Sequence, residues 1–229
     1  MGLDAFLIPV TDEHFSEVIG PSDMRIKTLT GYTGTYGYAI AGRINIFITS
    51  MQFLDKANKE VKGFTVHDDA VGIHEYIIQS GIKKIGINTK TITSIQFKEL
   101  HEKLTAKGIQ IVEYDYDLFD KVWHNRPKRE FQNILNLEKL KLSKYIDKNY
   151  IKNFPELRID KDNNYNIDRD VVGETYISKL ERVRQLMDDD EGIVITRLNT
   201  IGWLLNLRGH DLEYSPDFYG FGYLTKKIL

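Results

Sequence analysis

The sequence of 229 residues contains no cysteine. This absence excludes disulfide bonds, thiolate metal sites and a cysteine nucleophile, because each of them needs the missing thiol. A chain without disulfides fits a reducing compartment, so we expect a cytoplasmic protein.

Long apolar runs and a strong net charge are also missing. No segment approaches the roughly 18 apolar residues that a membrane-spanning helix needs, and the first thirteen residues lack the basic start of a secretion signal. The net charge is -2 and the isoelectric point is about 6.3, so no overall field attracts nucleic acid or anionic lipid. We therefore expect no nucleic-acid partner and no membrane partner. With 41% hydrophobic residues, the chain has ample material for a folded core.

Common catalytic and metal-binding spacings are absent too. The six histidines form no H-E-x-x-H pair, and no G-x-S-x-G motif is present. Residues 160–168 space their oxygen side chains like the first half of a calcium loop. However, Tyr165 stands where that loop needs glycine, and Val171 where it needs glutamate. We expect no catalytic residue and no metal site in this chain.

The residues that are present alternate between two patterns. Short apolar runs read as buried strands, and stretches with apolar residues three or four apart read as amphipathic helices. This alternation predicts an α/β fold whose first part has a largely parallel sheet. We expect strands within residues 4–10, 29–49, 84–88 and 108–114, and helices over 69–81 and 94–107.

A second, weaker unit follows. Residues 176–187 read as an amphipathic helix, and from Gly192 the sequence reads as strand, turn, helix and sharp loop. The opening of the chain shows a similar order, which suggests two related α/β modules. Between them, residues 126–161 carry ten Lys or Arg against five Asp or Glu. This basic segment is interpreted as a solvated linker, with a docking patch for an acidic partner as the alternative.

One loop of the second unit is the best candidate for a functional role. Arg208, His210 and Asp211 lie together directly after an apolar helix. Polar groups on a loop that a rigid helix positions are often functional. The alternative is that their hydrogen bonds only fix the loop.

Several sets of these residues resemble the cytosolic-type aminopeptidases P (Xaa-Pro aminopeptidases) of the creatinase/prolidase family. The chain opens with Asp4-Ala-Phe-Leu-Ile-Pro-Val-Thr-Asp-Glu-His14, followed by Asp23 and Arg25. Asp120-Lys-Val-Trp-His-Asn-Arg-Pro127 resembles the motif that closes the first domain of that family. Gly202-Trp-Leu-Leu-Asn-Leu-Arg-Gly209, followed by Asp211, resembles the entry to its second domain. Residues 47–53 and 215–218 depart from the family pattern.

The resemblance implies a domain arrangement. It predicts a creatinase N-terminal-like domain over residues 1–127, with a mixed sheet flanked by helices. Residues 128–170 would be a linker or insertion. Residues 171–229 would begin a second, related α/β domain that is truncated here. Catalysis belongs to a third, pita-bread-fold domain, which is absent from these residues.

The resemblance also implies a function for the whole protein. The complete enzyme would be a homodimer that uses two divalent metal ions, expected to be manganese, to remove an N-terminal residue preceding proline. Its peptide substrate would be bound by the absent domain. This chain would then be a noncatalytic region that contributes to assembly and substrate access, with Arg208, His210 and Asp211 toward the substrate entrance. The alternative is a stand-alone, non-enzymatic module of aminopeptidase-like fold that binds peptides or histones.

Overall fold

The computed structural model describes residues 2–139 and 172–227, which form parts of two compact units. Unit 1 is Met1–Arg129 and unit 2 is Glu130–Leu229. Most of the predicted linker, and with it the larger part of the basic segment and residues 160–168, lies outside the described residues. None of the helices in the described parts is long and apolar enough to cross a membrane.

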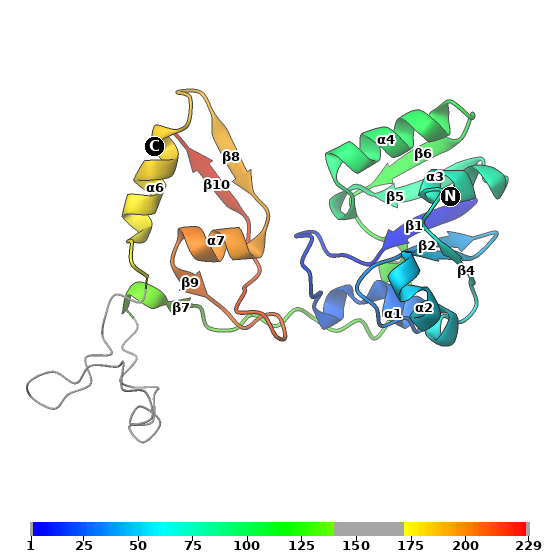
Figure 1. The fold of residues 1–229 in the computed structure, drawn as a ribbon, viewed down its shortest axis with the longest axis horizontal. Helices are drawn as coiled ribbons and strands as arrows, with labels where there is room; N and C mark the ends of the chain where they lie inside the picture. The colour runs from blue at the N-terminus through cyan, green and yellow to red at the C-terminus, as the bar shows by residue number, and fades with distance from the viewer. Residues whose placement is uncertain (1, 140–171, 228–229) are drawn as a thin grey trace, which may run out of the picture. The chain divides into compact units, whose positions relative to one another are not determined.

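Unit 1 is built on a mixed six-stranded sheet, as expected (Figure 1). The strand order is β4-β3-β2-β1-β5-β6. Strand β2 runs antiparallel to both of its neighbours, and the other neighbouring pairs are parallel. The carboxyl ends of five strands therefore meet at one edge of the sheet. The strands are β1 (Ala5–Pro9), β2 (Tyr38–Gly42), β3 (Ile46–Thr49), β4 (Thr65–Asp68), β5 (Lys84–Asn88) and β6 (Gln110–Tyr114).

Helices cover both faces of this sheet because alternate residues of β1 are buried on opposite sides. Ala5 and Leu7 belong to one core cluster, together with Ile77 of α3 and Leu104 of α4. Phe6 and Ile8 belong to a second cluster, which includes residues of α1 and α2. The helices are α1 (Arg25–Thr30), α2 (Leu54–Glu60), α3 (Ile73–Gln79) and α4 (Ser94–Thr105), with short 3-10 turns η1 (Pro21–Asp23), η2 (Met51–Phe53), η3 (Thr89–Thr91) and η4 (Leu118–Lys121).

Local chemistry fixes the limits of the helices. Helix α4 begins at a reciprocal capping box, in which the side chains of Thr93 and Gln96 each accept a hydrogen bond from the other residue's backbone N–H. Helix α3 begins at Ile73, four residues after the predicted start, because Gly72 has a φ of 82°, outside the helical range. Helix α1 was not predicted, and its last two residues fall within the segment, 29–49, for which the sequence predicted strands. It ends at Gly31, whose φ is 87°.

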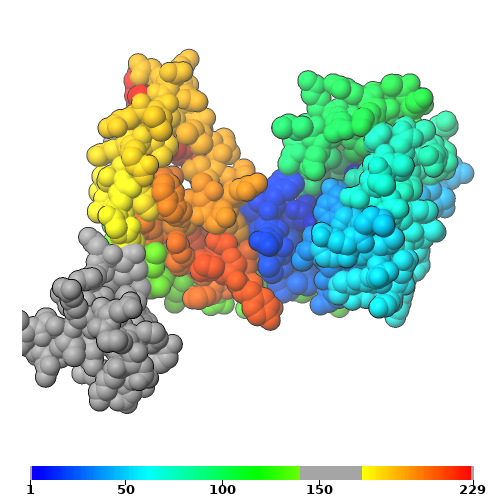
Figure 2. All heavy atoms as spheres, viewed as in Figure 1, coloured from blue at the N-terminus to red at the C-terminus, as the bar shows by residue number. Residues whose placement is uncertain are grey.

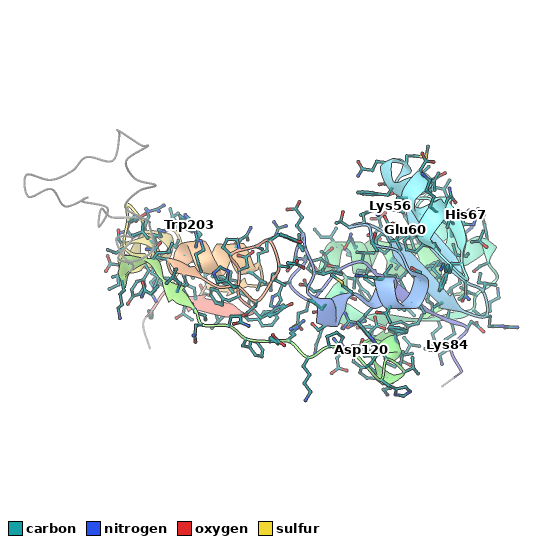
Figure 3. The ribbon with its side chains drawn as sticks, turned by 90° about the horizontal axis from the view of Figure 1, so that it is seen from below. Lys56, Glu60, His67, Lys84, Asp120 and Trp203 are labelled. Atoms are coloured by element: carbon teal, nitrogen blue, oxygen red, sulfur yellow. The ribbon has the colours of Figure 1, made fainter. Side chains whose placement is uncertain are left out.

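The far end of α2 is joined to the loop after α1. Lys56 and Glu60 lie one helical turn apart, with Lys56 Nζ 2.7 Å from Glu60 Oε1 (Figure 3). The Glu60 carboxylate also accepts the backbone N–H of Thr33 at 2.8 Å. These bonds lower the pKa of Glu60, with the Lys56 hydrogen bond as the largest cause.

The described residues of unit 2 form two helices and two short antiparallel ribbons. Strand β8 (Gly192–Ile195) pairs with β10 (Gly222–Thr225), and β7 (Leu135–Asn136) pairs with β9 (Leu207–Arg208). The helices are α6 (Tyr176–Gln185) and α7 (Leu198–Leu204), and η5 covers Leu137–Lys139. Buried Met187, Leu198, Ile201, Leu204 and Leu224 supply the apolar interior of this unit.

Candidate functional site

The three residues predicted from sequence lie on one loop of unit 2, at the end of β9. Arg208 is half-buried and bonded to backbone. Its Nη1 donates to the carbonyl oxygens of Gly202 at 3.0 Å and Leu207 at 2.7 Å. The bond to Gly202 joins the guanidinium to the last turn of α7, and the bond to Leu207 stays within β9. The two bonds fix the orientation of the Arg208 side chain, and they also hold the loop in place.

Asp211 organises the loop through both of its carboxylate oxygens. Oδ1 accepts the backbone N–H of Gln132 at 2.7 Å, and Oδ2 accepts that of Tyr219 at 2.9 Å. The Asp211 backbone N–H in turn donates to Asp217 O at 3.1 Å. One side chain therefore joins three separated parts of unit 2. The Asp211 carboxylate therefore positions the backbone of this loop.

His210 differs from its neighbours because its side chain is exposed. The three candidates are therefore neighbours on one loop with different surroundings. Arg208 donates to backbone carbonyls, Asp211 accepts from backbone N–H groups, and His210 is exposed. In the described parts of the chain, no group of three or more His, Asp or Glu residues could hold a metal ion. The loop can bind and orient a polar partner, but it contains no catalytic pair.

The motif residues of unit 1 converge on a second polar centre. The Arg25 guanidinium makes a two-pronged contact with Asp120, with Nε to Oδ1 at 2.8 Å and Nη2 to Oδ2 at 2.9 Å (Figure 3 labels Asp120). Arg126 reaches the same carboxylate, with Nη1 2.7 Å from Oδ2. Paired N–H donors of this kind give strong and directional bonds. They join the start of α1 to the segment that ends unit 1.

Buried Asp23 extends this centre. One of its oxygens accepts Arg25 Nη1 at 3.3 Å, and the other accepts Arg129 Nη2 at 3.1 Å. Arg129 also donates to Glu13 Oε1 at 2.6 Å. We call Glu13, Asp23, Arg25, Asp117, Asp120, Arg126 and Arg129 the ionic cluster. Its charges come from three separate segments of unit 1, which it holds together.

Within the ionic cluster, Asp117 is a carboxyl group whose ionisation the fold disfavours. Its side chain is fully buried, and Oδ1 accepts the Phe119 backbone N–H at 2.9 Å. Oδ2 has no hydrogen bond, and Arg25 Nε is 3.8 Å away. Burial raises the pKa of Asp117 to about 6, although Arg25 acts in the opposite direction.

A third polar group lies in unit 2, and two of its members, Trp203 and Asn206, belong to the motif over residues 202–209. Lys179 is 5% exposed, and its Nζ donates to Trp203 O at 2.8 Å and to Asn206 Oδ1 at 2.6 Å. The ammonium also lies 4.5 Å from the centre of the Trp203 ring. Asn206 completes the group by donating to Glu138 Oε1 at 2.8 Å. Sequence spacing could not reveal it because Glu138 and Asn206 lie 68 residues apart.

Comparison with known proteins shows which proteins the chain resembles. Residues 155–229 match the family model for the Creatinase/Prolidase N-terminal domain. Over 97% of its length, the chain is 26% identical to a probable Xaa-Pro aminopeptidase P from Pyrenophora teres f. teres and 24% identical to one from Leptosphaeria maculans. The chain is homologous to the N-terminal third of Xaa-Pro aminopeptidase P. This confirms the resemblance inferred from the motifs.

A solved structure supports the fold. The X-prolyl aminopeptidase of Caenorhabditis elegans matches 98% of this chain with a TM-score of 0.79 and 22% sequence identity. That protein is described as a cytosolic enzyme with a di-nuclear active site. The match covers 34% of the Caenorhabditis elegans chain, and the two fungal matches cover 31% and 32% of those proteins. The chain thus spans about a third of the length of its relatives.

Proposed function

We propose that this chain is the noncatalytic N-terminal region of an Xaa-Pro aminopeptidase, where it contributes to assembly and controls substrate access. The observation that carries the proposal is the extent of the match. Nearly the whole chain aligns with Xaa-Pro aminopeptidases P, but it spans about a third of their length. The chain therefore corresponds to one region of a larger enzyme.

The catalytic chemistry of the complete protein would lie outside these residues. The described residues offer no cluster of three or more His, Asp or Glu side chains that could hold a metal ion. The complete enzyme would use two divalent metal ions, manganese in our proposal, bound by two Asp, one His and two Glu of its catalytic domain. The metals would activate water against the peptide bond that precedes proline. The enzyme would be cytoplasmic and would act as a homodimer.

Within this scheme, the chain contributes rigid surfaces. The ionic cluster fixes the end of unit 1, and the bonds of Arg208 and Asp211 fix the loop of unit 2. Rigid elements of this kind can restrict which peptides reach an active site, because they do not yield to a bulky substrate. We place the Arg208–Asp211 loop toward the substrate entrance.

Removal of this region from the complete enzyme tests the proposal. Light scattering would compare the mass of the complete enzyme with that of a form lacking residues 1–229. Peptides of increasing length with proline at the second position would measure access. We expect the shortened enzyme to lose dimers, or to cleave long peptides at a rate closer to that of short ones. Unchanged mass together with an unchanged length preference would contradict the proposal.

A further inference from the structure

Unit 1 contains a cavity of about 630 Å³ at the carboxyl edge of its sheet. Its lining includes Pro9 at the end of β1 and Ile87 of β5. After β1 the chain continues to one side of the sheet, through β2, β3 and β4, and it returns on the other side of β1 as β5. The strand order thus changes direction between β1 and β5. Open α/β sheets commonly bind ligands at this position, and the volume is typical of such sites.

The interior of the cavity is apolar, and two neighbouring helices border it. Helices α3 and α4 contact each other over one face of the sheet, and their turquoise and green residues adjoin in Figure 2. Side chains from both helices and from the sheet form the wall. The apolar lining residues include Leu7, Pro9, Ile73, Ile87, Ile92 and Leu100. This interior would take an apolar group of a ligand.

The charged lining residues leave one uncompensated charge. Lys103 Nζ lies 2.6 Å from Glu99 Oε1, so these two charges offset each other. His74 Nε2 lies 3.5 Å from Glu75 Oε1. Asp69 makes no ion pair with any residue that the structure describes, and its Oδ2 accepts a hydrogen bond from Tyr36 Oη at 2.9 Å. The cavity therefore presents one carboxylate that lacks a cation.

Aromatic rings lie beside this carboxylate. The rings of Tyr36 and Tyr38 are 5.7 Å apart and nearly perpendicular, at 87°. Phe15, which also lines the cavity, is 38% exposed. Burial raises the pKa values of both tyrosines, so their hydroxyls stay protonated and neutral. Aromatic faces attract organic cations, and a nearby carboxylate strengthens that attraction.

We infer that this cavity binds the amino terminus of a peptide whose first residue is apolar. The ammonium group would lie against Asp69, Tyr36 and Tyr38, and the apolar side chain would enter the cavity. A metal ion fits poorly because only one carboxylate is free of a cationic partner. An anionic ligand also fits poorly, because the Asp69 carboxylate would repel it. The inference does not depend on the proposed function, because the site is complete within unit 1.

A binding experiment on the whole 229-residue chain tests this inference. The probe is leucyl-leucinamide, which has an apolar first residue, a free amino terminus and no proline, so it is not an Xaa-Pro substrate. Calorimetry would measure its affinity, and amide chemical shifts would locate it. We expect shifts at residues 36–38 and 69–73, and affinity at least about tenfold weaker for the N-acetylated probe, because acetylation removes the positive charge.

Two variants and one control separate charge from structure. Asp69→Asn keeps the size of the side chain and should weaken binding of the free-amine probe about tenfold, while leaving binding of the acetylated probe unchanged. Asp55→Asn alters an exposed carboxylate in the first turn of α2 and should leave binding unchanged. If Asp69→Asn disturbs folding, as judged by its circular dichroism, Val71→Trp replaces it. Val71 is 52% exposed at the cavity, and the larger side chain should block entry and abolish binding.

Three results would each overturn the inference. The first is equal affinity for the free and acetylated probes, which would indicate an apolar cavity without ammonium recognition. The second is undiminished binding by Asp69→Asn, or by Val71→Trp if that variant is needed. The third is absence of binding, or chemical shifts confined to other parts of the chain. None of these results bears on the proposed enzyme.

Discussion

Asp117 allows a quantitative test of the ionic cluster. The carboxyl group is fully buried and Oδ2 lacks a hydrogen bond, so ionisation is disfavoured in the folded chain. Its folded pKa is about 6, against 3.8 as the ordinary value that we assign to the unfolded chain. A carboxyl group whose pKa is raised by folding stabilises the folded state at low pH, where it binds a proton. That contribution is lost as the pH rises through the folded pKa.

The size of the effect follows from these two pKa values. Between about pH 5 and pH 7, the folded chain releases most of the Asp117 proton, whereas the unfolded chain has already lost it. Linkage then gives a loss of about 1 kcal/mol in the free energy of unfolding from this group. Asp117→Asn cannot ionise, and its side-chain oxygen can still accept the Phe119 N–H. The variant should therefore lack this part of the pH dependence.

Urea unfolding of the wild type and the variant at both pH values measures the effect. Trp123 lies in unit 1 and Trp203 in unit 2, and the chain has two tryptophans, so a Trp203→Phe background makes fluorescence report on unit 1 alone. Every other ionisable group is the same in both proteins, so its contribution cancels in the difference. Asp55→Asn serves as an exposed control. An equal change between the two pH values in wild type and Asp117→Asn would refute the assignment of a raised pKa.

Three further predictions concern single side chains. Arg25→Ala should destabilise unit 1 by about 3 kcal/mol or more, because it removes a buried partner from Asp120 and Asp23. As a control, Arg43→Ala removes an exposed ion pair and should change the unfolding free energy by about 1 kcal/mol at most. Urea titrations followed by Trp123 fluorescence would measure both changes. Lys179→Met should lower the unfolding free energy of unit 2 by about 1 to 3 kcal/mol, since it takes the lysine donor from Asn206 Oδ1 and removes one of the hydrogen bonds to Trp203 O. Trp203 fluorescence would show a stability equal to wild type if the group is unimportant. In the complete enzyme, Arg208→Ala should lower kcat/KM about tenfold, or about 1.4 kcal/mol; unchanged kinetics with reduced thermal stability would assign Arg208 to the loop alone.

Part of the fold could be predicted from the sequence because its signals are local. The strand β5, helix α4 and strand β6 fall close to their predicted ranges. Gly81 precedes β5, Thr93 caps α4, and Gly108 separates α4 from β6. Helix α1 was not predicted. It has six residues, and its first residue, Arg25, is held by Asp120, 95 positions away in the sequence. Short helices depend on such tertiary contacts, which no local pattern reveals.

The candidate sites, too, were predictable only where their residues are close together in the sequence. Arg208, His210 and Asp211 could be proposed together because they are adjacent in the sequence, but their hydrogen-bond partners could not. Gln132, for example, is 79 residues away from Asp211. Most of the ionic cluster was visible as motif residues, without any sign that they touch, whereas Asp117 and Arg129 were not among those residues. The cavity gave no signal at all, since Tyr36 and Asp69 meet only when β2 and β4 take their places in the sheet.

The most direct test of the central claim is a peptidase measurement on two proteins. One is the 229-residue chain, and the other is the product of the complete coding sequence from which it comes. Each would be incubated with manganese and a peptide that has proline in the second position, with and without a chelator. We predict chelator-sensitive cleavage by the complete product and none by the 229-residue chain. Chelator-sensitive cleavage by the 229-residue chain itself, or inactivity of the complete product, would contradict the account.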